Sequence, residues 1–333
     1  MKLASIVEHY YYAYLKKYGD TALPSHLKAL QAIRRCRTPD SGEFYVQCPD
    51  CHYGHWVPLS CGHRSCPHCQ NHEASQWIAR QQKKLLPVHY FMLTFTIPYE
   101  LRTLAWQHQR DVYSLMFRCV CSVLKDFALS PKHLGAEIGM TMVLHTHTRK
   151  LDYHPHLHVV VPGGGVDKKR RQWKKKKGKY LFNHTALALV FRARLLTSLH
   201  QAGLAIPTQM PEKWVVDCAH VGTGITAIKY LSRYLYRGVI SEQNIVSDEN
   251  GQVTFRYSDS STGETCYRTV AGETFLDLLM HHVLPKGFRR VRDYGFLHAN
   301  AKKLLALVQL ILQVCIARCM HKSRPVMLLP CLL

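Results

Sequence analysis

The sequence predicts an α+β fold in which helices pack on one antiparallel sheet. Residues 91–97 (FMLTFTI) alternate apolar side chains with mixed ones, as a strand with one buried face does. Residues 140–148 and residues 152–162 follow each other like the two strands of a hairpin. A long helical pattern fills residues 101–129 between the first strand and this pair. The order strand, helix, strand pair and helix favours antiparallel pairing over a parallel, doubly wound sheet.

Cysteines near the N-terminus predict a small zinc-binding module. Six of the 13 cysteines lie between Cys36 and Cys69, and in a cytosolic chain cysteines favour metal binding over disulfides. Two C-x-x-C knuckles, CPDC and CPHC, have the spacing at which two thiolates of a tight turn bind one zinc ion. Four thiolates leave no open coordination position, so this zinc is expected to be structural. Its predicted ligands are Cys48, Cys51, Cys66 and Cys69, with Cys36 and Cys61 as further candidates for the same zinc or a second one.

Three histidines stand at alternate positions in the segment DYHPHLHVVVP. Period-two strand geometry turns His154, His156 and His158 onto one face, while the apolar residues between and after them face the other way. Such a row of imidazoles is a metal-binding pattern, although a packed or exposed polar face is the commoner reading of a histidine pair in a strand.

Two tyrosines about 70 residues further on supply candidate nucleophiles. When residues 225–237 are placed on a helix, the apolar side chains form one stripe, and Tyr230 and Tyr234 lie nearly opposite it. These two tyrosines lie beside Arg233 and Arg237 on a cationic, solvent-facing side. Tyr236 lies nearer the apolar edge and is expected to pack.

The charge of the chain indicates a polyanionic partner. Lys and Arg outnumber Asp and Glu by 44 to 22, which gives a formal charge of +22. Nucleic acid is the leading partner. A membrane-spanning helix is not expected, because residues 304–317, the most apolar stretch, are interrupted by Gln309 and Gln313. Without a signal-peptide core, the chain is expected in the cytoplasm.

A basic run follows the histidine strand. Nine of the 12 residues from Lys168 to Lys179 are Lys or Arg, so mutual repulsion predicts a mobile loop that contacts phosphates. Trp173, within the run, is a candidate for stacking on a base. The predicted DNA-binding residues are Lys168, Lys169, Arg170, Arg171, Lys174 and Lys175 of this run, with Arg233 and Arg237.

Five blocks in order resemble the rolling-circle insertion-sequence transposases, which are two-tyrosine HUH endonucleases. They are the cysteine knuckles, LTFTIP, HPHLHVVVPGGG, YLSRY and HVLPKGFRRVRDYGFL. The resemblance implies an antiparallel HUH nuclease sheet in which the strand with Thr96 lies beside His156 and His158. These histidines would hold a divalent ion, Mg²⁺ or Mn²⁺, and Tyr230 and Tyr234 would be the nucleophiles. The third ligand stays open among His145, His147, His154 and a Gln or Glu after the tyrosine helix.

The same resemblance divides the chain into three regions. Residues 1–80 would form a zinc-binding, DNA-recognition module, residues 85–245 the HUH nuclease domain, and residues 246–333 a basic, helical C-terminal region. The setting it implies is the bacterial nucleoid. The family's closing C-x-x-C pair is replaced by Cys331 alone, so we expect an altered C-terminal end.

The implied function is nicking and rejoining of single-stranded DNA through a 5′-phosphotyrosine intermediate. The ester bond stores the energy for rejoining, and the chain lacks a G-x-x-x-x-G-K-[ST] loop, so no nucleotide cofactor is expected. Two alternatives remain. One is the same chemistry in a replication initiator or relaxase, and the other is a non-catalytic zinc protein that binds nucleic acid.

Overall fold

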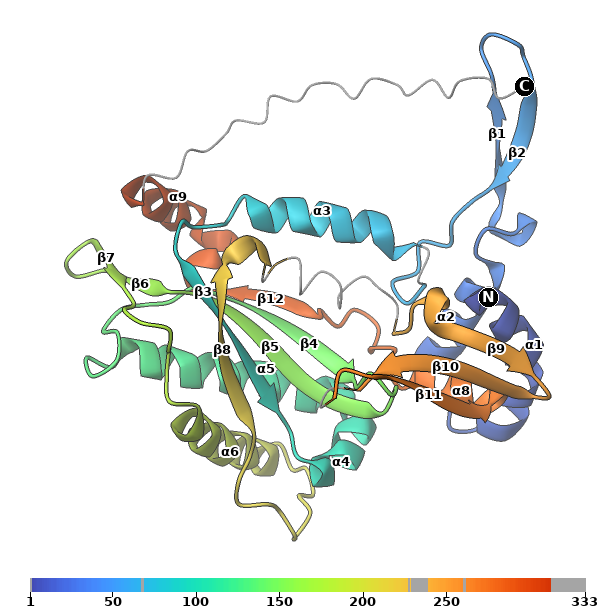
Figure 1. The fold of residues 1–333 in the computed structure, drawn as a ribbon. Helices are drawn as coiled ribbons and strands as arrows, with labels where there is room; N and C mark the ends of the chain where they lie inside the picture. Colours follow the sequence, from blue (N-terminus) through green and yellow to red (C-terminus); the bar gives the residue numbers. More distant parts are fainter. Residues whose placement is uncertain (1, 67–68, 227, 229–238, 260–261, 313–333) are drawn as a thin grey trace.

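The computed structural model describes residues 2–66, 69–226, 228, 239–259 and 262–312. It has an α+β architecture with antiparallel sheets, as predicted (Figure 1). The predicted nucleophiles Tyr230 and Tyr234 lie outside the described residues. So do their cationic neighbours, Arg233 and Arg237, and Cys331.

A five-stranded sheet forms the centre of the molecule, and all its neighbouring strands are antiparallel. In spatial order the strands are β12 (Val291–Tyr294), β4 (Met140–His147), β5 (Tyr153–Pro162), β3 (His89–Thr96) and β8 (Val216–Thr223). The predicted strand pair is the hairpin of β4 and β5, and the strand that contains Thr96 lies beside β5 as expected.

Three helices cover one face of this sheet: α4 (Arg102–Gln107), α5 (Gln109–Leu129) and α6 (His184–Gln201) (Figure 1). The side chains of Leu157 and Val159 are fully buried in this core. Because strand residues alternate, His154, His156 and His158 face the opposite side of the sheet. That side is partly covered by α3 (Gln70–Gln82).

A second core combines the N-terminal helices with a segment that ends near Val283. Helices α1 (Leu3–Tyr18) and α2 (Pro24–Arg35) pack with α8 (Gly272–Met280) and with a sheet of β9, β10 and β11. These strands are Ile245–Glu249, Gln252–Ser258 and Thr265–Ala271. The C-terminal region, which we predicted to be helical, therefore also contains strands. In β10, Val253 and Phe255 alternate with polar residues and are fully buried, as in a strand with one buried face.

Much of the basic run belongs to a hairpin rather than a mobile loop, so that prediction is wrong. Strand β6 (Gly164–Asp167), which directly precedes the run, pairs with β7 (Gln172–Lys175), which lies within it. Local acids offset its charge: Lys174 Nζ lies 2.9 Å from Asp167 Oδ2, and Lys168 Nζ lies 2.8 Å from Glu137 Oε2. The Asp167 carboxylate also accepts hydrogen bonds from the backbone amides of the turn, at 3.1 and 3.2 Å.

Trp173, the candidate for stacking on a base, is half-buried against the protein in this structure. Its ring packs edge-on against Phe296, with the ring centroids 5.8 Å apart, and its indole nitrogen is buried. Gly164 is required beneath it, because an added Cβ would lie 2.4 Å from the Trp173 ring. The indole therefore belongs to the hydrophobic packing under the hairpin.

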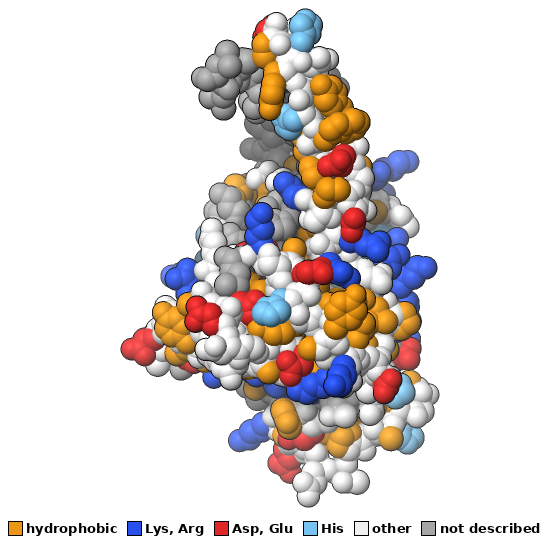
Figure 2. Space-filling view, turned by 90° about the vertical axis from the view of Figure 1, so that its right-hand side faces the viewer, with side chains coloured by type: hydrophobic (Ala, Val, Ile, Leu, Met, Phe, Trp, Pro, Cys, Tyr) orange, Lys and Arg blue, Asp and Glu red, His pale blue; other side chains and the backbone are white. Residues whose placement is uncertain are grey.

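Another hairpin, formed by β1 (Glu43–Gln47) and β2 (Gly54–Pro58), projects from the molecule (Figure 1). Figure 2 shows hydrophobic side chains along it at the top of the view. The exposed aromatic residues on it are Phe44, Tyr45, Tyr53 and Trp56. Helix α9 (Lys302–Ile311) packs elsewhere through Val308, and its Gln309 donates a hydrogen bond to Lys83 O at 2.9 Å.

Five short 3₁₀ turns complete the described elements. They are η1 (Pro39–Ser41), η2 (Tyr99–Leu101), η3 (Glu242–Asn244), η4 (Gly295–Leu297) and η5 (Ala299–Ala301). Among the described residues, no helix combines the length and apolar character needed to cross a bilayer.

Candidate functional site

Three imidazoles gather on the face of the central sheet opposite the helices. His145 of β4 is paired in register with His156 of β5, and His158 follows two residues later on the same face. One ligand nitrogen from each lies within 4.8 Å of the others, and the three side chains are mostly or fully buried. Three nitrogen donors so close together fit a single divalent transition-metal ion.

Neighbouring groups orient two of these rings. His156 Nδ1 lies 2.7 Å from the carbonyl oxygen of His154. A carbonyl only accepts, so Nδ1 carries the proton and the lone pair of Nε2 is left for a metal. His158 Nδ1 lies 3.1 Å from Thr94 Oγ1, on the register partner of His158 in β3. This hydroxyl fixes the orientation of the second ring.

His154 is engaged differently from the other two histidines of its strand. Its Nδ1 lies 2.5 Å from Arg102 Nη2, so the ring accepts a hydrogen bond from the guanidinium. Burial, followed by the neighbouring His156, lowers the pKa of His154 to about 4. Its place in the cluster is taken by His145, one of the candidates that the sequence left open.

The cluster favours neutral imidazoles at neutral pH. Burial lowers the pKa of His158 to about 3, with a smaller contribution from His156. Burial also lowers the pKa of His145 well below its usual value, and the adjacent histidines add to the effect. Neutral rings are the form that binds metal.

A cavity of about 580 Å³ opens over the cluster. The histidines form one wall, and the turn between β4 and β5 contributes Arg149 and Lys150. The end of β10 forms another wall, with Tyr257 and Asp259. The second core thus contributes directly to the site, which the sequence did not predict because these residues lie about 100 positions from the histidines.

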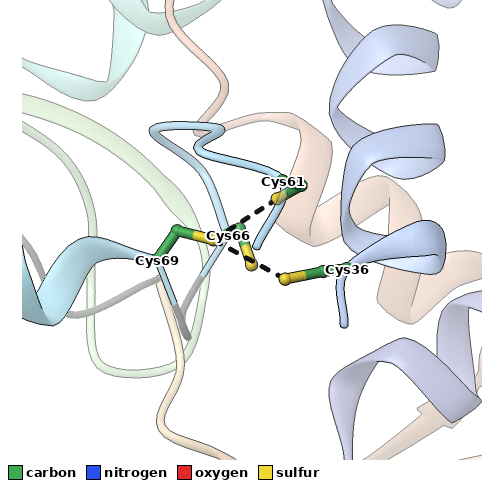
Figure 3. Close-up of side chains that lie close together, drawn as sticks. All are labelled: Cys36, Cys61, Cys66 and Cys69. Carbon is green, nitrogen blue, oxygen red and sulfur yellow. Dashed lines mark hydrogen bonds between the residues drawn. The ribbon is translucent and has the colours of Figure 1, made fainter. Parts of the chain in front are cut away.

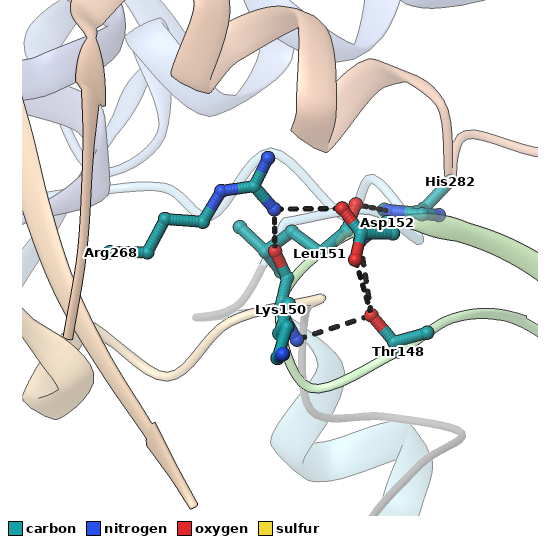
Figure 4. Close-up of polar contacts among 6 residues, drawn as sticks. All are labelled: Thr148, Lys150, Leu151, Asp152, Arg268 and His282. Atoms are coloured by element: carbon teal, nitrogen blue, oxygen red, sulfur yellow. Dashed lines mark hydrogen bonds and ion pairs between the residues drawn. The ribbon is translucent and has the colours of Figure 1, made fainter. Parts of the chain in front are cut away.

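The β4–β5 turn is held by the second core (Figure 4). Arg268 of β11 donates to Lys150 O and pairs with Asp152 Oδ1 at 2.8 Å. His282 Nε2 donates to Leu151 O at 3.1 Å, and the Leu151 side chain is buried in the second core. Because the turn joins the two strands that carry the cluster, these contacts fix the ends of both strands.

Four cysteines form a second candidate metal centre: Cys36, Cys61, Cys66 and Cys69 (Figure 3). Their sulfur atoms all lie within 4.8 Å of one another, with Cys36 and Cys61 at 3.6 and 3.5 Å from Cys69. Tetrahedral zinc with bonds of about 2.3 Å places its sulfurs about 3.8 Å apart, so this donor set fits zinc. Burial raises the pKa of Cys36 to about 11, and a bound cation would reverse that direction by favouring the thiolate.

The structure does not bring Cys48 and Cys51 into this group. They occupy the turn of the projecting hairpin, where Cys48 exchanges backbone hydrogen bonds with Tyr53 and His52 at 2.8 and 3.0 Å. The base of the hairpin, not its turn, lies near the cysteine cluster. There Arg37, the residue after Cys36, donates a backbone hydrogen bond to Leu59 O. Five extended residues at about 3.3 Å each carry the turn roughly 15 Å from the base. The CPHC knuckle therefore pairs with Cys36 and Cys61.

Two family models match the chain, and one of them describes a zinc-binding domain. Residues 139–304 match the family described as "Putative transposase", and residues 6–97 match the family described as "Transposase zinc-binding domain". Among solved structures, the chain is similar to the conjugative relaxase TrwC in complex with oriT DNA in its metal-bound form. That similarity covers 68% of this chain and 71% of that one, at 15% identity and a TM-score of 0.31.

Two curated proteins give the family. A "Transposase for insertion sequence element IS801" from Pseudomonas savastanoi pv. phaseolicola is 27% identical, over 79% of this chain and 68% of that protein. "Putative transposase y4qJ" from Sinorhizobium fredii is 33% identical, over 85% of this chain and 78% of that protein. The chain thus belongs to the insertion-sequence transposase family of these relatives and carries its N-terminal zinc-binding domain.

Proposed function

We propose that this transposase nicks and rejoins single-stranded DNA by tyrosine transesterification, at the ends of its own insertion sequence. The observation that carries the proposal is the cluster of His145, His156 and His158 in one wall of a cavity that Arg and Lys side chains also line. Neutral imidazoles and nearby Arg and Lys side chains suit a phosphodiester held at a divalent ion.

The histidines of this chain would bind the ion, and nitrogen ligands suit Mn²⁺ better than Mg²⁺. When bound, the ion neutralises the non-bridging oxygens of the scissile phosphate and orients it for attack. Thr94 and the His154 carbonyl hold the two rings of β5 in position. Arg149 and Lys150 would bind the phosphates on either side.

Tyr230 or Tyr234 would supply the attacking hydroxyl oxygen. It forms a bond to phosphorus, the bond to the 3′ oxygen breaks, and that oxygen takes a proton to become a free 3′-hydroxyl. The 5′-phosphotyrosine keeps the energy of the broken ester. Attack of a 3′-hydroxyl on it reforms DNA and releases the tyrosine, so no nucleotide cofactor is consumed.

The four-cysteine centre would hold a structural zinc ion, because four thiolates leave no position for substrate. The β6–β7 hairpin keeps its predicted role in binding the DNA backbone through Lys169, Arg170, Arg171 and Lys175. This role does not need a mobile loop.

The test uses single strands from the DNA that flanks the chain's own coding sequence, labelled at the 3′ end. With Mn²⁺ we expect a denaturant-resistant protein–DNA adduct that retains the label, because the 5′ phosphate of the labelled fragment is joined to tyrosine. Mass spectrometry of the adduct should map it to Tyr230 or Tyr234.

The double variant Tyr230→Phe with Tyr234→Phe should lose the adduct. Tyr236→Phe is the matched control on the same segment and should retain it. Binding of the strand without any adduct would contradict the proposal and leave a non-catalytic zinc protein that binds nucleic acid.

A further inference from the structure

We propose that Tyr257, with Lys150 and Arg149, forms a binding subsite for one unpaired nucleobase of the substrate strand, next to the histidine cluster. This inference rests on the proposed function and adds a residue that recognises DNA beside the metal. The ligand class is a base flanked by phosphates in single-stranded DNA.

The position of Tyr257 follows from the alternation of β10. Val253 and Phe255 point into the second core and are fully buried. Tyr257 is the next residue on that face, but it lies at the end of the strand, where the core ends and the cavity begins. Its ring is half-buried: packing against the second core holds it, while the remaining surface lines the cavity.

The subsite and the candidate metal ligands share one cavity. Tyr257, His145, His156 and His158 all line the same space of about 580 Å³. A strand whose phosphate reaches the histidines therefore passes the tyrosine ring within the same cavity. A base held there would fix which phosphate meets the cluster.

Cations of the β4–β5 turn complete the subsite. Arg149 Nη1 donates to Ser258 O at 3.2 Å, which ties the turn to the end of β10. Lys150 Nζ lies over the Tyr257 ring, 5.6 Å from its centroid. Lys150 is exposed and flexible, so its ammonium group can move to a phosphate when a base takes the ring face.

This combination of an aromatic platform and cations is the usual chemistry of single-strand binding. An exposed cation–π contact is weaker than the stacking of a base on an aromatic ring, so the exchange favours the bound state. The turn that carries both cations is also anchored before DNA arrives, through the contacts of Arg268 with Asp152 and of His282 with Leu151 O.

The test measures binding of the zinc-loaded full chain to single strands from its own flanking DNA, without added Mn²⁺ or Mg²⁺. Each strand carries 2-aminopurine at one position, since stacking quenches its fluorescence. We expect quenching at one position near the cleaved phosphate. Tyr257→Ala should abolish that quenching and weaken binding by roughly 5- to 150-fold.

Two variants separate stacking from other roles. Tyr257→Phe keeps the ring and should bind and quench like the wild type. Tyr267→Ala is the matched control: Tyr267 is an exposed tyrosine of the same sheet, and its register partner Arg256 places it on the opposite face from Tyr257. This control should leave binding and quenching unchanged.

Each other outcome contradicts either the subsite or the proposed function. If Tyr257→Ala binds and quenches like the wild type, the subsite is wrong. Loss of the covalent adduct in Tyr257→Phe would show that the hydroxyl acts, which also contradicts stacking. Failure of the wild type to bind single strands at all refutes the proposed function itself. Should Tyr257→Ala lose its fold, Tyr257→Leu keeps the apolar packing and must show the same loss of quenching.

Discussion

His145 and His156 lie opposite each other on adjacent antiparallel strands, with their ring centroids 5.2 Å apart. We expect His145→Ala to weaken Mn²⁺ binding by at least tenfold, because it removes one of three nitrogen donors. Calorimetric titration with Mn²⁺ measures the change. His154→Ala is the control on the neighbouring strand and should bind Mn²⁺ nearly as well as the wild type. Equal losses in both variants would mean that His154 is a ligand.

The hydroxyl of Thr94 should matter for metal binding although it touches no metal. Thr94→Val removes the partner of His158 Nδ1, and losses of such partners cost about 10- to 100-fold in metal affinity or activity. Thr96→Val is the matched control, because Thr96 lies two residues along the same face. The measurement is the ratio of the Mn²⁺ affinities of the two variants. A ratio near one would contradict a role of the Thr94 hydroxyl in metal binding.

The cysteine set can be tested by counting zinc. We expect Cys36→Ser to fall below the wild-type zinc content and to lower the melting temperature, because a tetrahedral site loses one thiolate. Cys48→Ser should keep the zinc that Cys36→Ser loses. Native mass spectrometry gives the metal content per chain. If only Cys48→Ser loses zinc, the two predicted knuckles bind it together after all.

Arg64 joins the zinc-binding loop to the segment that leads into β12. Its guanidinium donates to Phe288 O, Leu284 O and Pro285 O at 2.9, 2.6 and 2.8 Å. We expect Arg64→Ala to lower the free energy of unfolding by roughly 2–4 kcal/mol, since three carbonyls lose a charged donor. Urea unfolding measures it. Arg64→Lys should lose less free energy of unfolding than Arg64→Ala but should not match the wild type, because an ammonium group lacks the planar fork of donors that a guanidinium has.

Acid should weaken the contact between α2 and the helices under the central sheet. His26 stacks on Trp106, and burial, followed by nearby His281, lowers the pKa of His26 from 6.5 to about 4. As the pH falls, the unfolded chain therefore binds this proton at a higher pH than the folded chain does. The contribution of His26 to the free energy of unfolding is at its full value at neutral pH and is lost between about pH 6.5 and pH 4. His26 would account for roughly 2–3 kcal/mol of that decline.

The matched variant for this prediction is His26→Phe, which keeps a ring beside Trp106 but cannot titrate. Its melting temperature should fall less than that of the wild type between pH 7 and about 4.5. Parallel melting curves for the two proteins over this range would contradict the assignment.

Local patterns sufficed for three of the five strands of the central sheet, namely β3, β4 and β5. Alternation in residues 91–97 and 152–162 needs no distant partner to be recognised, and it placed the histidines on one face correctly. The register of two strands then brought Thr94 and His145 to the cluster, and register depends on pairing that single-strand periodicity does not specify.

Long-range contacts explain what the sequence did not predict. The cysteine set depends on the direction in which a hairpin projects, and the fixed basic hairpin depends on Glu137, about 30 residues away from Lys168. Tyr257 reaches the cavity because the second core is assembled from segments that lie far apart in the sequence. No local sequence pattern at these residues predicts which distant residues they contact.

The second core also sets when the protein can first act during synthesis. Leu3 N donates to Glu242 Oε1 at 2.7 Å across 239 residues, and α1 packs on α8, which comes later still. At about 5–20 residues per second, the first helices wait roughly 10–50 s for these partners to leave the ribosome. Until then nothing anchors the β4–β5 turn or supplies Tyr257. A nascent chain thus carries its histidines long before it has the framework to use them on DNA.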